Sequence, residues 1–240
     1  MKRAVSIRPA AFLDPKLLAF RLLSMVPYQP LRAYGRRGFF GRRRAYVSVD
    51  LEFILTQLSP NPVIVDLGAN EGAFSSQVAR LSGELHAFEP DPSTFLRLKS
   101  NLAAHRNVTL YNMAVGQDDG EVELFRGLNF ETDPHSASLS SSTIIRHENV
   151  NIRNSIKVQQ VGIISLLEKI GTPIDLLKMD IEGSEVSVLE RLFSNEILNS
   201  ISIIIVETHE HCIPNLVDRT FELRRAARKL SHPVIVMDWH

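Results

Sequence analysis

Carboxylates and imidazoles gather in two short stretches of the chain, each directly after an apolar run. The letters DIEG at 180–183 follow the run 174–179, and ETH at 207–209 follows the run 201–206. Such side chains can take a proton from a hydroxyl group, because imidazole titrates near neutral pH and the pKa of a carboxyl can be tuned by its surroundings. We therefore expect the catalytic groups to come from one set: Asp180, Glu182, Glu207 and His209.

Other interpretations of these residues stay open. A divalent metal held by Asp180, Glu207 and His209 would lower the pKa of an acceptor hydroxyl, and such ligands suit Mg²⁺ or Mn²⁺. We favour a general base without a metal. His209 and His211 can also be ordinary polar histidines of a loop. Glu185, expected in the first turn of a helix, suits the positive end of the helix dipole.

A turn bracketed by glycines follows another apolar run, in the stretch IVDLGANEG at 64–72. Gly68 lets a ligand approach the backbone closely, and the amides of a helix that starts after Gly72 can receive negative charge. The spacing is G-x-x-x-G, however, and not the G-x-G-x-x-G of pyrophosphate binding. Asp66 would repel a diphosphate but suits a ligand with an ammonium group. The turn therefore argues against a nicotinamide-dependent oxidoreductase.

A second acid completes the argument about the nucleotide. Glu89 comes twenty-one residues after Gly68, directly after the apolar run 85–88. A carboxylate at this place can accept hydrogen bonds from both hydroxyls of a ribose. A nucleoside with a cationic amino-acid tail fits both Asp66 and Glu89, so we expect the cofactor to be S-adenosylmethionine.

Apolar runs alternate with helical patterns along the body of the chain. This alternation predicts an α/β fold with a doubly wound, mostly parallel, Rossmann-like sheet. Ligands of such sheets bind at the carboxyl ends of the strands, where the polar stretches above fall. The runs that predict the strands lie at 63–67, 85–88, 108–113, 174–179, 201–206 and 234–237.

Two segments outside this alternation, 121–125 and 156–161, repeat with period two and predict outer strands. The serine-rich stretch 136–142 lies between them. It can close over the cofactor or contact a polyhydroxylated acceptor. Runs of this composition are more often flexible connectors, which is the interpretation we favour.

Three motifs together resemble the FkbM family of S-adenosylmethionine-dependent methyltransferases. They are DLGANEG at 66–72, FEP at 88–90 and KMDIEGSE at 178–185, and the similarity runs from about residue 62 to 210. The resemblance implies a methyltransferase domain of class I type and methyl transfer to a hydroxyl of a small molecule, a sugar or a glycolipid. It also implies the residues that hold the cofactor: Asp66, Gly68, Ala69, Asn70, Gly72 and Glu89, with Asn112 near the adenine.

The chain departs from the usual pattern of this fold at one place. Methyltransferases of this type finish with two strands after the fifth, the last one antiparallel, whereas here the predicted strands stop at the sixth, 234–237. Either the seventh strand is missing or the register of the last strands is set wrongly. An exposed sheet edge would need a cover, such as a second subunit or the N-terminal arm.

The first part of the chain is strongly basic. Residues 1–44 hold eleven Lys or Arg and one acid, against sixteen bases and twenty-six acids in the rest. We divide the chain into a basic N-terminal extension, 1–47, and a cofactor-binding domain, 48–240. Within the extension, 12–26 predicts an amphipathic helix with Leu13, Leu17, Phe20 and Leu23 on one side. This helix can lie on a membrane surface or pack on the body, and packing is the commoner case.

Prolines and glycines in 27–44 predict a loop or linker. Five arginines of this region, at 36, 37, 42, 43 and 44, can hold an anionic acceptor such as a phosphorylated or lipid-linked sugar. A nucleic-acid acceptor is not expected, because the net charge is zero and an N-P-P-Y-type motif is missing.

Cysteine usage and hydropathy bear on location. The chain has one cysteine, Cys212, and its sequence shows neither an apolar run of about 18–20 residues nor a signal-peptide pattern. We expect a cytoplasmic protein, possible peripheral membrane contact through the N-terminal arm, and an acceptor that is a small molecule or glycan. The alternative function is a non-catalytic cofactor-binding module that acts on a partner through the basic arm. The sequence leaves the oligomeric state open.

Overall fold

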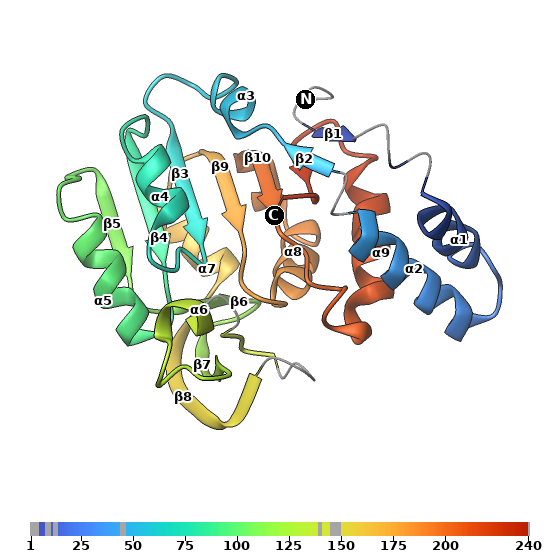
Figure 1. Ribbon diagram of the computed structural model, residues 1–240. Coiled ribbons are helices and arrows are strands. Elements are labelled where there is room, and N and C mark those ends of the chain that lie inside the picture. The colour runs from blue at the N-terminus through green and yellow to red at the C-terminus, as the bar shows by residue number, and fades with distance from the viewer. Residues whose placement is uncertain are drawn as a thin grey trace.

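A six-stranded parallel sheet forms the centre of the molecule (Figure 1). The computed structural model describes residues 5–7, 11, 14–43, 47–138, 141–144 and 150–239. Across the sheet the strands are β5 (Val108–Tyr111), β4 (Glu84–Phe88), β3 (Val63–Leu67), β9 (Ile174–Met179), β10 (Ile201–Val206) and β11 (Val234–Val236). The predicted doubly wound, mostly parallel sheet is confirmed.

The order of the strands reverses beside β3. The chain runs outward from β3 through β4 to β5, and then returns to place β9 on the other side of β3. Leu67 is paired with Met179, so the carboxyl ends of β3 and β9 lie side by side. A switch point of this kind opens a crevice at the carboxyl ends of the strands. The fold thereby brings together the two stretches that follow β3 and β9.

Both faces of the sheet are covered, which explains why its strands are nearly continuous apolar runs. Ile64 of β3 packs in one core cluster with Phe74 and Val78, whereas Val65 belongs to a second cluster with Leu189. The elements against the first face are α3 (Leu51–Leu55) and α4 (Ala73–Val78), and those against the second are α7 (Ile163–Ile170), α8 (Glu185–Phe193) and α9 (Val217–Ala227). The body also contains α5 (Pro92–Asn101) and the 3₁₀ turns Glu196–Ser200 and Pro214–Leu216.

A smaller sheet lies beyond the carboxyl ends of the central strands. It has the order β6 (Ala114–Gly116), β8 (Val150–Gly162), β7 (Gly120–Gly127), and α6 (Pro134–Ser138) follows β7. The outer strands predicted at 121–125 and 156–161 are confirmed, and both extend further. Arg126 Nε donates to Asp91 Oδ2 at 2.7 Å, and this contact ties the small sheet to the start of α5. Burial would raise the pKa of Asp91, but Arg126 and the groups at the helix start lower it.

The N-terminal region contains two helices that pack as a hairpin, α1 (Pro15–Leu23) and α2 (Gln29–Arg43). The helix predicted at 12–26 is confirmed in its described part, whereas Leu13 lies outside the described residues. The loop predicted at 27–44 is wrong, because α2 fills most of it. Gly35 packs on the backbone of Leu23 and Ser24, and Gly38 packs on the ring of Phe20. The glycines therefore allow close packing of two helices instead of breaking a helix.

Arginines of α2 fasten the hairpin to the body. Arg36 Nη1 donates to Asp218 Oδ1 at 2.7 Å, and Arg43 pairs with Asp238. Three of the five arginines expected to hold an anionic acceptor are thus paired with acids of the chain itself, since Arg42 pairs with Asp14. Arg37 Nε donates to the backbone oxygen of His211, and Arg44 lies outside the described residues.

A short ribbon joins the N-terminal region to the body. β1 (Val5–Ile7) pairs antiparallel with β2 (Val47–Val49), across the boundary we placed at residue 47, which stays a prediction. Val5 and Val49 pack against the core cluster that contains Val236 of β11. Within the described residues the central sheet ends at β11, parallel to β10, and shows no antiparallel seventh strand. The N-terminal ribbon therefore packs near the edge that we expected to need a cover.

Within the described ranges, no helix has both the length and the apolar character needed to cross a membrane.

Candidate functional site

A cavity of about 440 Å³ opens at the carboxyl ends of β3, β4, β9 and β10. Its volume lies in the range that holds a small-molecule ligand. Of the predicted site residues, Gly68, Ala69, Asn70, Glu89, Asp180, Glu182 and Glu207 line it, and Asp66, Gly72, Asn112 and His209 do not. The structure thus brings seven of the eleven predicted residues to one cavity, whereas the other four do not line it.

The glycine turn after β3 is shaped by its neighbours. Gly68 has φ +78° and Gly72 has φ +91°, a backbone conformation that other residues rarely adopt. A Cβ on Gly68 would collide with the backbone oxygen of Asp180, and one on Gly72 would lie 2.8 Å from Leu98 Cδ1. Gly68 is thus required by its packing on the backbone of Asp180, and both glycines suit their positive φ, whether or not a ligand approaches the turn.

Glu89 connects the glycine turn to the end of β4. Its carboxylate accepts hydrogen bonds from the backbone N–H groups of Asn70, at 3.0 Å, and Asp91, at 2.9 Å. The residue is only 7% exposed, and burial raises the pKa of Glu89 to about 7 although these N–H groups and Lys178 favour the charged form. A carboxyl with this pKa can change its protonation state near neutral pH.

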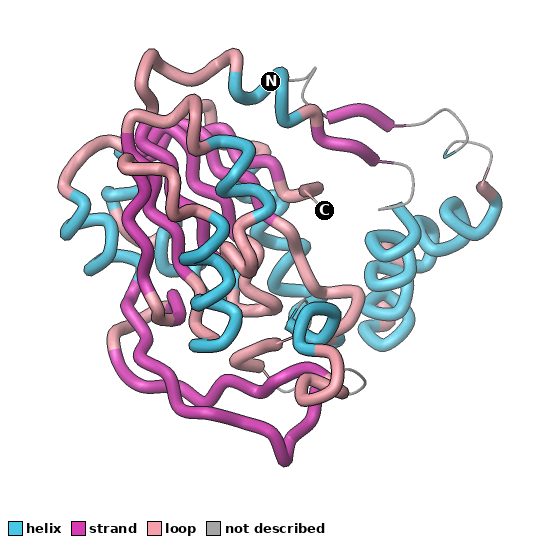
Figure 2. The backbone as a smooth tube through the Cα atoms, turned by 60° about the vertical axis from the view of Figure 1, so that its left-hand side comes forward, coloured by secondary structure: helices cyan, strands magenta, loops and turns pink. Residues whose placement is uncertain are grey.

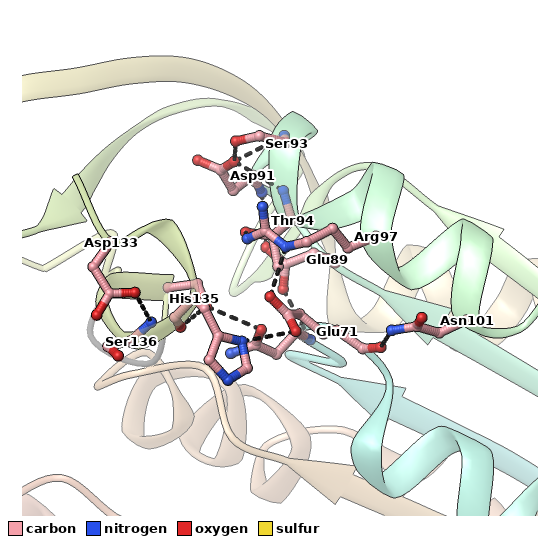
Figure 3. A network of polar contacts seen from close by, with 12 residues as sticks. Glu71, Glu89, Asp91, Ser93, Thr94, Arg97, Asn101, Asp133, His135 and Ser136 are labelled. Carbon is pink, nitrogen blue, oxygen red and sulfur yellow. Dashed lines mark hydrogen bonds and ion pairs between the residues drawn. The ribbon is translucent and has the colours of Figure 1, made fainter. Parts of the chain in front are cut away.

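Glu71, also in the glycine turn, is the centre of a polar network (Figure 3). Its carboxylate accepts from Arg97 Nε at 2.6 Å and lies 2.8 Å from His135 Nδ1, while Asn101 donates to its backbone oxygen. Burial would raise the pKa of Glu71, but His135 and Arg97 outweigh it and lower the pKa. The network therefore joins α6, which carries His135, to the glycine turn.

Part of the serine-rich stretch reaches the same wall. Ser138 Oγ donates to Asn70 Oδ1 at 3.1 Å, and both Ser138 and Ser141 line the cavity. Residues 139 and 140 lie outside the described residues. The described part of this stretch therefore lies beside the glycine turn, and its closure over a cofactor stays a prediction.

Asp66 is fully buried and acts on the cavity only through its partners. It accepts from Ser75 Oγ at 2.7 Å and lies 3.1 Å from Lys178 Nζ. Lys178 also lies 3.5 Å from Asp180 and donates to the backbone oxygen of Gly68. Burial would lower the pKa of Lys178, but Asp66 and Asp180 raise it, so the group is an ammonium. Asp66 therefore pairs with Lys178, and the contact with the cofactor that the sequence suggested stays a prediction.

Asn112 stabilises the end of β4 from outside the cavity. Its side-chain amide donates to the backbone oxygens of Glu89, at 2.9 Å, and Pro90, at 3.0 Å. The neighbouring Met113 lines the cavity. The adenine contact expected of Asn112 stays a prediction, and its amide nitrogen already has these two partners.

His209 lies behind the cavity wall among three carboxylates. Its Nδ1 is 3.0 Å from Glu185 Oε1, and its Nε2 is 3.4 Å from Glu182 Oε2 and 3.9 Å from Asp180 Oδ1. The ring is almost completely buried, with 5% exposure. Asp180 and Glu182 therefore separate His209 from the space where a substrate would lie.

Glu185 holds this arrangement together. Besides His209, it accepts hydrogen bonds from the backbone N–H groups of Ile181, at 2.8 Å, and Gly183, at 2.9 Å. Burial would raise the pKa of Glu185, but His209 and the N–H groups lower it. The carboxylate thus binds the loop before α8. The sequence predicted only that Glu185 would lie in the first turn of the helix, and not that it would bind this loop.

Three of these residues can offer ligand atoms to one metal ion. Atoms of Asp180, Glu182 and His209 all lie within 4.8 Å of one another. The set differs from the one expected from the sequence, because Glu182 takes the place of Glu207. Glu207 lines the cavity from the end of β10. The same three groups can equally pass a proton between carboxylate and imidazole.

Two residues that are not glycine face the cavity with a left-handed backbone. Asn70 has φ 50° and Glu182 has φ 58°, and both line the cavity. Asn tolerates this conformation, whereas for Glu it is unfavourable by roughly 1–2 kcal/mol. Strained residues of this kind cluster at functional sites.

Sequence patterns missed an aromatic part of the cavity lining. Trp239 lines the cavity together with Phe74 and Gln77 of α4, and the Trp239 and Phe74 rings meet edge to face with centroids 5.9 Å apart. Trp239 follows β11, so only the folded topology brings it to α4. The pattern within the stretch 234–239 carries no signal for this position.

Comparison with known proteins gives one family match. Residues 66–225 match the family described as the Methyltransferase FkbM domain. The 2-O-methyltransferase NoeI of Sinorhizobium fredii is 27% identical over 139 residues, which are 54% of this chain and 57% of that protein. The hexuronic acid methyltransferase AglP of Haloferax volcanii is 25% identical over 183 residues, which are 75% of this chain and 70% of that protein.

These matches are partial in length. The chain spans little more than half of the length of the first of these relatives. Among solved structures, an rRNA methylase from Streptococcus thermophilus superposes with a TM-score of 0.40 and 10% identity, over 71% of this chain and 75% of that one.

Proposed function

Because the chain belongs to the FkbM methyltransferase family, we propose that it transfers a methyl group from S-adenosylmethionine to a hydroxyl oxygen of a sugar-type acceptor. The names of its two relatives, a 2-O-methyltransferase and a hexuronic acid methyltransferase, support oxygen as the methylated atom and a sugar as the acceptor. The observation that carries the proposal is the position of Glu89, which lines the cavity beside the glycine turn.

The chemistry of the cavity wall fits the cofactor. Glu89 supplies a carboxylate for the two ribose hydroxyls, and the backbone of 68–71 supplies polar groups for the amino-acid end. Met113 and Leu124 add an apolar wall that suits a purine ring. Asp66 contributes indirectly, because it fixes Lys178 beneath the turn.

The bound cofactor supplies an electrophilic methyl group on a sulfonium, which leaves as a thioether while the new O–CH₃ bond forms. The protein must hold the acceptor oxygen in line with the breaking bond and remove its proton. In the proposal, Asp180 orients the hydroxyl, since Lys178 holds the carboxylate of Asp180 at the carboxyl end of β9. Trp239 and Gln77 line the side of the cavity that is left for the acceptor.

The proton leaves the acceptor through Glu182. This residue lines the cavity, and its Oε2 lies 3.4 Å from His209 Nε2. His209 can then receive the proton, because Glu185 stabilises the resulting imidazolium from the other side. In this role His209 and Glu185 are positioning residues, whereas Glu182 touches the substrate.

Two measurements test the proposal. Titration calorimetry with S-adenosylhomocysteine should give a saturable binding curve, and absence of binding by the folded protein contradicts the proposal at its base. Cofactor with an isotopically labelled methyl group, mixed with glycosides, uronic acids and glycolipids, should then yield a product that mass spectrometry identifies as a methyl ether. Binding without transfer to any acceptor would favour the non-catalytic module instead.

The proposal includes a reducing compartment such as the cytoplasm, because the chain holds one cysteine and no pair for a disulfide.

A further inference from the structure

The hairpin of α1 and α2 exposes large apolar side chains. Of the ten large hydrophobic residues that are exposed in the described part of the chain, six lie between positions 18 and 34. Their exposed fractions range from 46% to 74%, and the residues are Leu18, Leu22, Met25, Tyr28, Leu31 and Tyr34. Soluble proteins leave single apolar residues exposed, but concentration in one short segment marks an interaction surface.

The inner seam of the hairpin explains why these side chains face outward. Gly35 and Gly38 of α2 face α1, where they pack on the backbone of Leu23 and on the ring of Phe20. Small residues at the seam let the two helix backbones approach closely, as they do in helix pairs inside membranes. The Phe20 and Tyr34 rings also meet across this seam, with centroids 5.6 Å apart, whereas Leu18, Leu22 and Leu31 remain exposed to solvent.

The hairpin is also basic throughout. Residues 15–43 contain seven Lys or Arg and no Asp or Glu. Arg36, Arg42 and Arg43 pair with acids of the chain, whereas Lys16 and Arg21 are exposed on α1 beside Leu18 and Leu22. A surface with exposed apolar side chains flanked by cations complements the acyl boundary and anionic headgroups of a lipid bilayer.

The position of the hairpin leaves this surface accessible. α2 packs on α9, and α1 packs on the outer side of α2, farthest from the sheet (Figure 1). Figure 2 shows the same arrangement after rotation, with the two helices at one edge of the molecule. The turn at 24–28, which carries Met25 and Tyr28, therefore lies at the periphery and not in the core.

We propose that the α1–α2 hairpin is a peripheral membrane-docking element, in which Leu22, Met25 and Tyr28 enter the headgroup boundary of an anionic bilayer. Lys16 and Arg21 contact the anionic headgroups. A second copy of the chain is the less suitable occupant, because it would bring the exposed cations Lys16 and Arg21 of both hairpins together, and like charges repel one another. The docking surface is separate from the methyl-transfer site, so it does not depend on the proposed reaction.

Vesicle co-sedimentation of the full chain tests this inference. The wild-type protein should sediment with vesicles of phosphatidylcholine and phosphatidylglycerol, more weakly with phosphatidylcholine alone, and less at high salt. The variant L18S/L22S/M25S should bind at least about tenfold more weakly, because apolar insertion is lost. The variant K16Q/R21Q should lose the preference for anionic vesicles while it keeps residual binding.

A matched control separates the hairpin from general surface hydrophobicity. The variant L81S/L96S/L128S removes three leucines of similar exposure, 49% to 67%, that lie outside the hairpin, and it should bind as the wild type does. Circular dichroism melting should be unchanged in all variants, since every substituted side chain is exposed. In addition, Tyr28→Trp should show a blue-shifted emission component with anionic vesicles that the wild type, with its one tryptophan, does not show.

Several results would overturn the inference. One is that the wild-type protein binds to none of the vesicles. Another is that the hairpin variant and the control variant bind equally well. A third is that the emission of the Tyr28→Trp variant does not change when vesicles are added. Light scattering that shows a dimer, converted to a monomer by L18S/L22S/M25S without vesicle binding, would assign the surface to a second copy. Binding to an acidic protein but to no vesicle would assign it to a protein partner.

Discussion

His209 Nδ1 lies 3.0 Å from Oε1 of the fully buried Glu185, so its Nε2 faces Glu182 and Asp180. A carboxylate on one ring nitrogen fixes the orientation of an imidazole and makes the other nitrogen a better proton acceptor. The buried carboxylate, the ring and the two carboxylates at the cavity therefore form one connected unit. Its members should affect methyl transfer more than cofactor binding.

Glu182→Gln and His209→Gln are expected to reduce kcat by about a hundredfold or more, because each removes a step of the proposed proton path. Affinity for S-adenosylhomocysteine, measured by calorimetry, should change little. His211→Gln is the matched control, since the His211 ring lies 6.1 Å from that of His209 and does not line the cavity. A His209→Gln enzyme with wild-type kcat would exclude the path.

Glu185→Gln should lower kcat and move the pH–rate profile, whereas a purely structural role would lower stability without moving the profile.

Incubation with EDTA should leave the rate unchanged under the proposed mechanism. A rate that falls with EDTA and returns with Mg²⁺ or Mn²⁺ would instead assign Asp180, Glu182 and His209 to a metal.

Lys178→Met is expected to reduce the free energy of unfolding by roughly 3–5 kcal/mol, because it leaves the fully buried Asp66 without its cation. Urea unfolding followed by circular dichroism measures the loss. The double variant D66N/K178M should recover part of it, since the unpaired charge is then gone. Equal stability of the single and double variants would show that the ion pair is not what Lys178 contributes.

Glu89 predicts a dependence of stability on pH. Its pKa is raised from 4.5 to about 7, so the folded state keeps a proton that the unfolded state has already lost. The contribution of Glu89 to the free energy of unfolding is therefore largest below pH 4.5. It is lost as the pH rises towards about 7, and the loss is on the order of 3 kcal/mol. Relative to wild type, Glu89→Gln should become more stable as pH rises through this window, in urea unfolding at pH 5 and pH 8.

The same residue should couple cofactor binding to pH. Ribose hydroxyls donate to the ionised carboxylate, so affinity for S-adenosylhomocysteine should rise as the pH increases through about 7. Glu89→Gln should bind at least about tenfold more weakly and show a flatter pH dependence. His135→Gln is the control for a second source of pH dependence near the cavity, the contact between His135 and Glu71. Glu71 raises the pKa of His135, so this pair can also change its protonation with pH. A pH-independent wild-type affinity would contradict the role of Glu89.

Trp239→Phe should raise the KM for the acceptor several-fold and leave affinity for S-adenosylhomocysteine nearly unchanged, since Trp239 lines the cavity after β11, which three strands separate from β4 and the Glu89 that follows it. Trp239 is the one tryptophan of the chain, so acceptor binding should alter the intrinsic fluorescence of the wild type. An increase in cofactor Kd without a change in acceptor KM would place the acceptor elsewhere.

The central sheet could be predicted because buried parallel strands are apolar on both faces. Ile174–Met179 and Ile201–Val206 show this directly, and the acids that follow them lie at the expected carboxyl ends. The positions of Gly68 and Glu89 on one wall follow from the same rule. The two strand-end stretches and the cavity were therefore within reach of sequence patterns.

What could not be predicted depends on contacts between distant parts of the chain. Gly35 and Gly38 suggested a loop, because the ring of Phe20 that fills the space beside Gly38 is visible only in the folded hairpin. The partner of Asp66 could not be predicted either, because Lys178 lies 112 positions away in the sequence and no local pattern links the two residues. Trp239 joins the cavity through the order of strands, which no local pattern encodes.

The left-handed backbone of Glu182 sets two kinds of selection against each other. Glycine adopts this conformation without steric strain, so Glu182→Gly removes an unfavourable backbone energy but also removes the carboxylate at the cavity. A directed-evolution experiment that selects for heat resistance would accept glycine there, whereas under the proposed mechanism one that selects for turnover would reject it. At position 182, selection for stability and selection for catalytic rate therefore favour different residues.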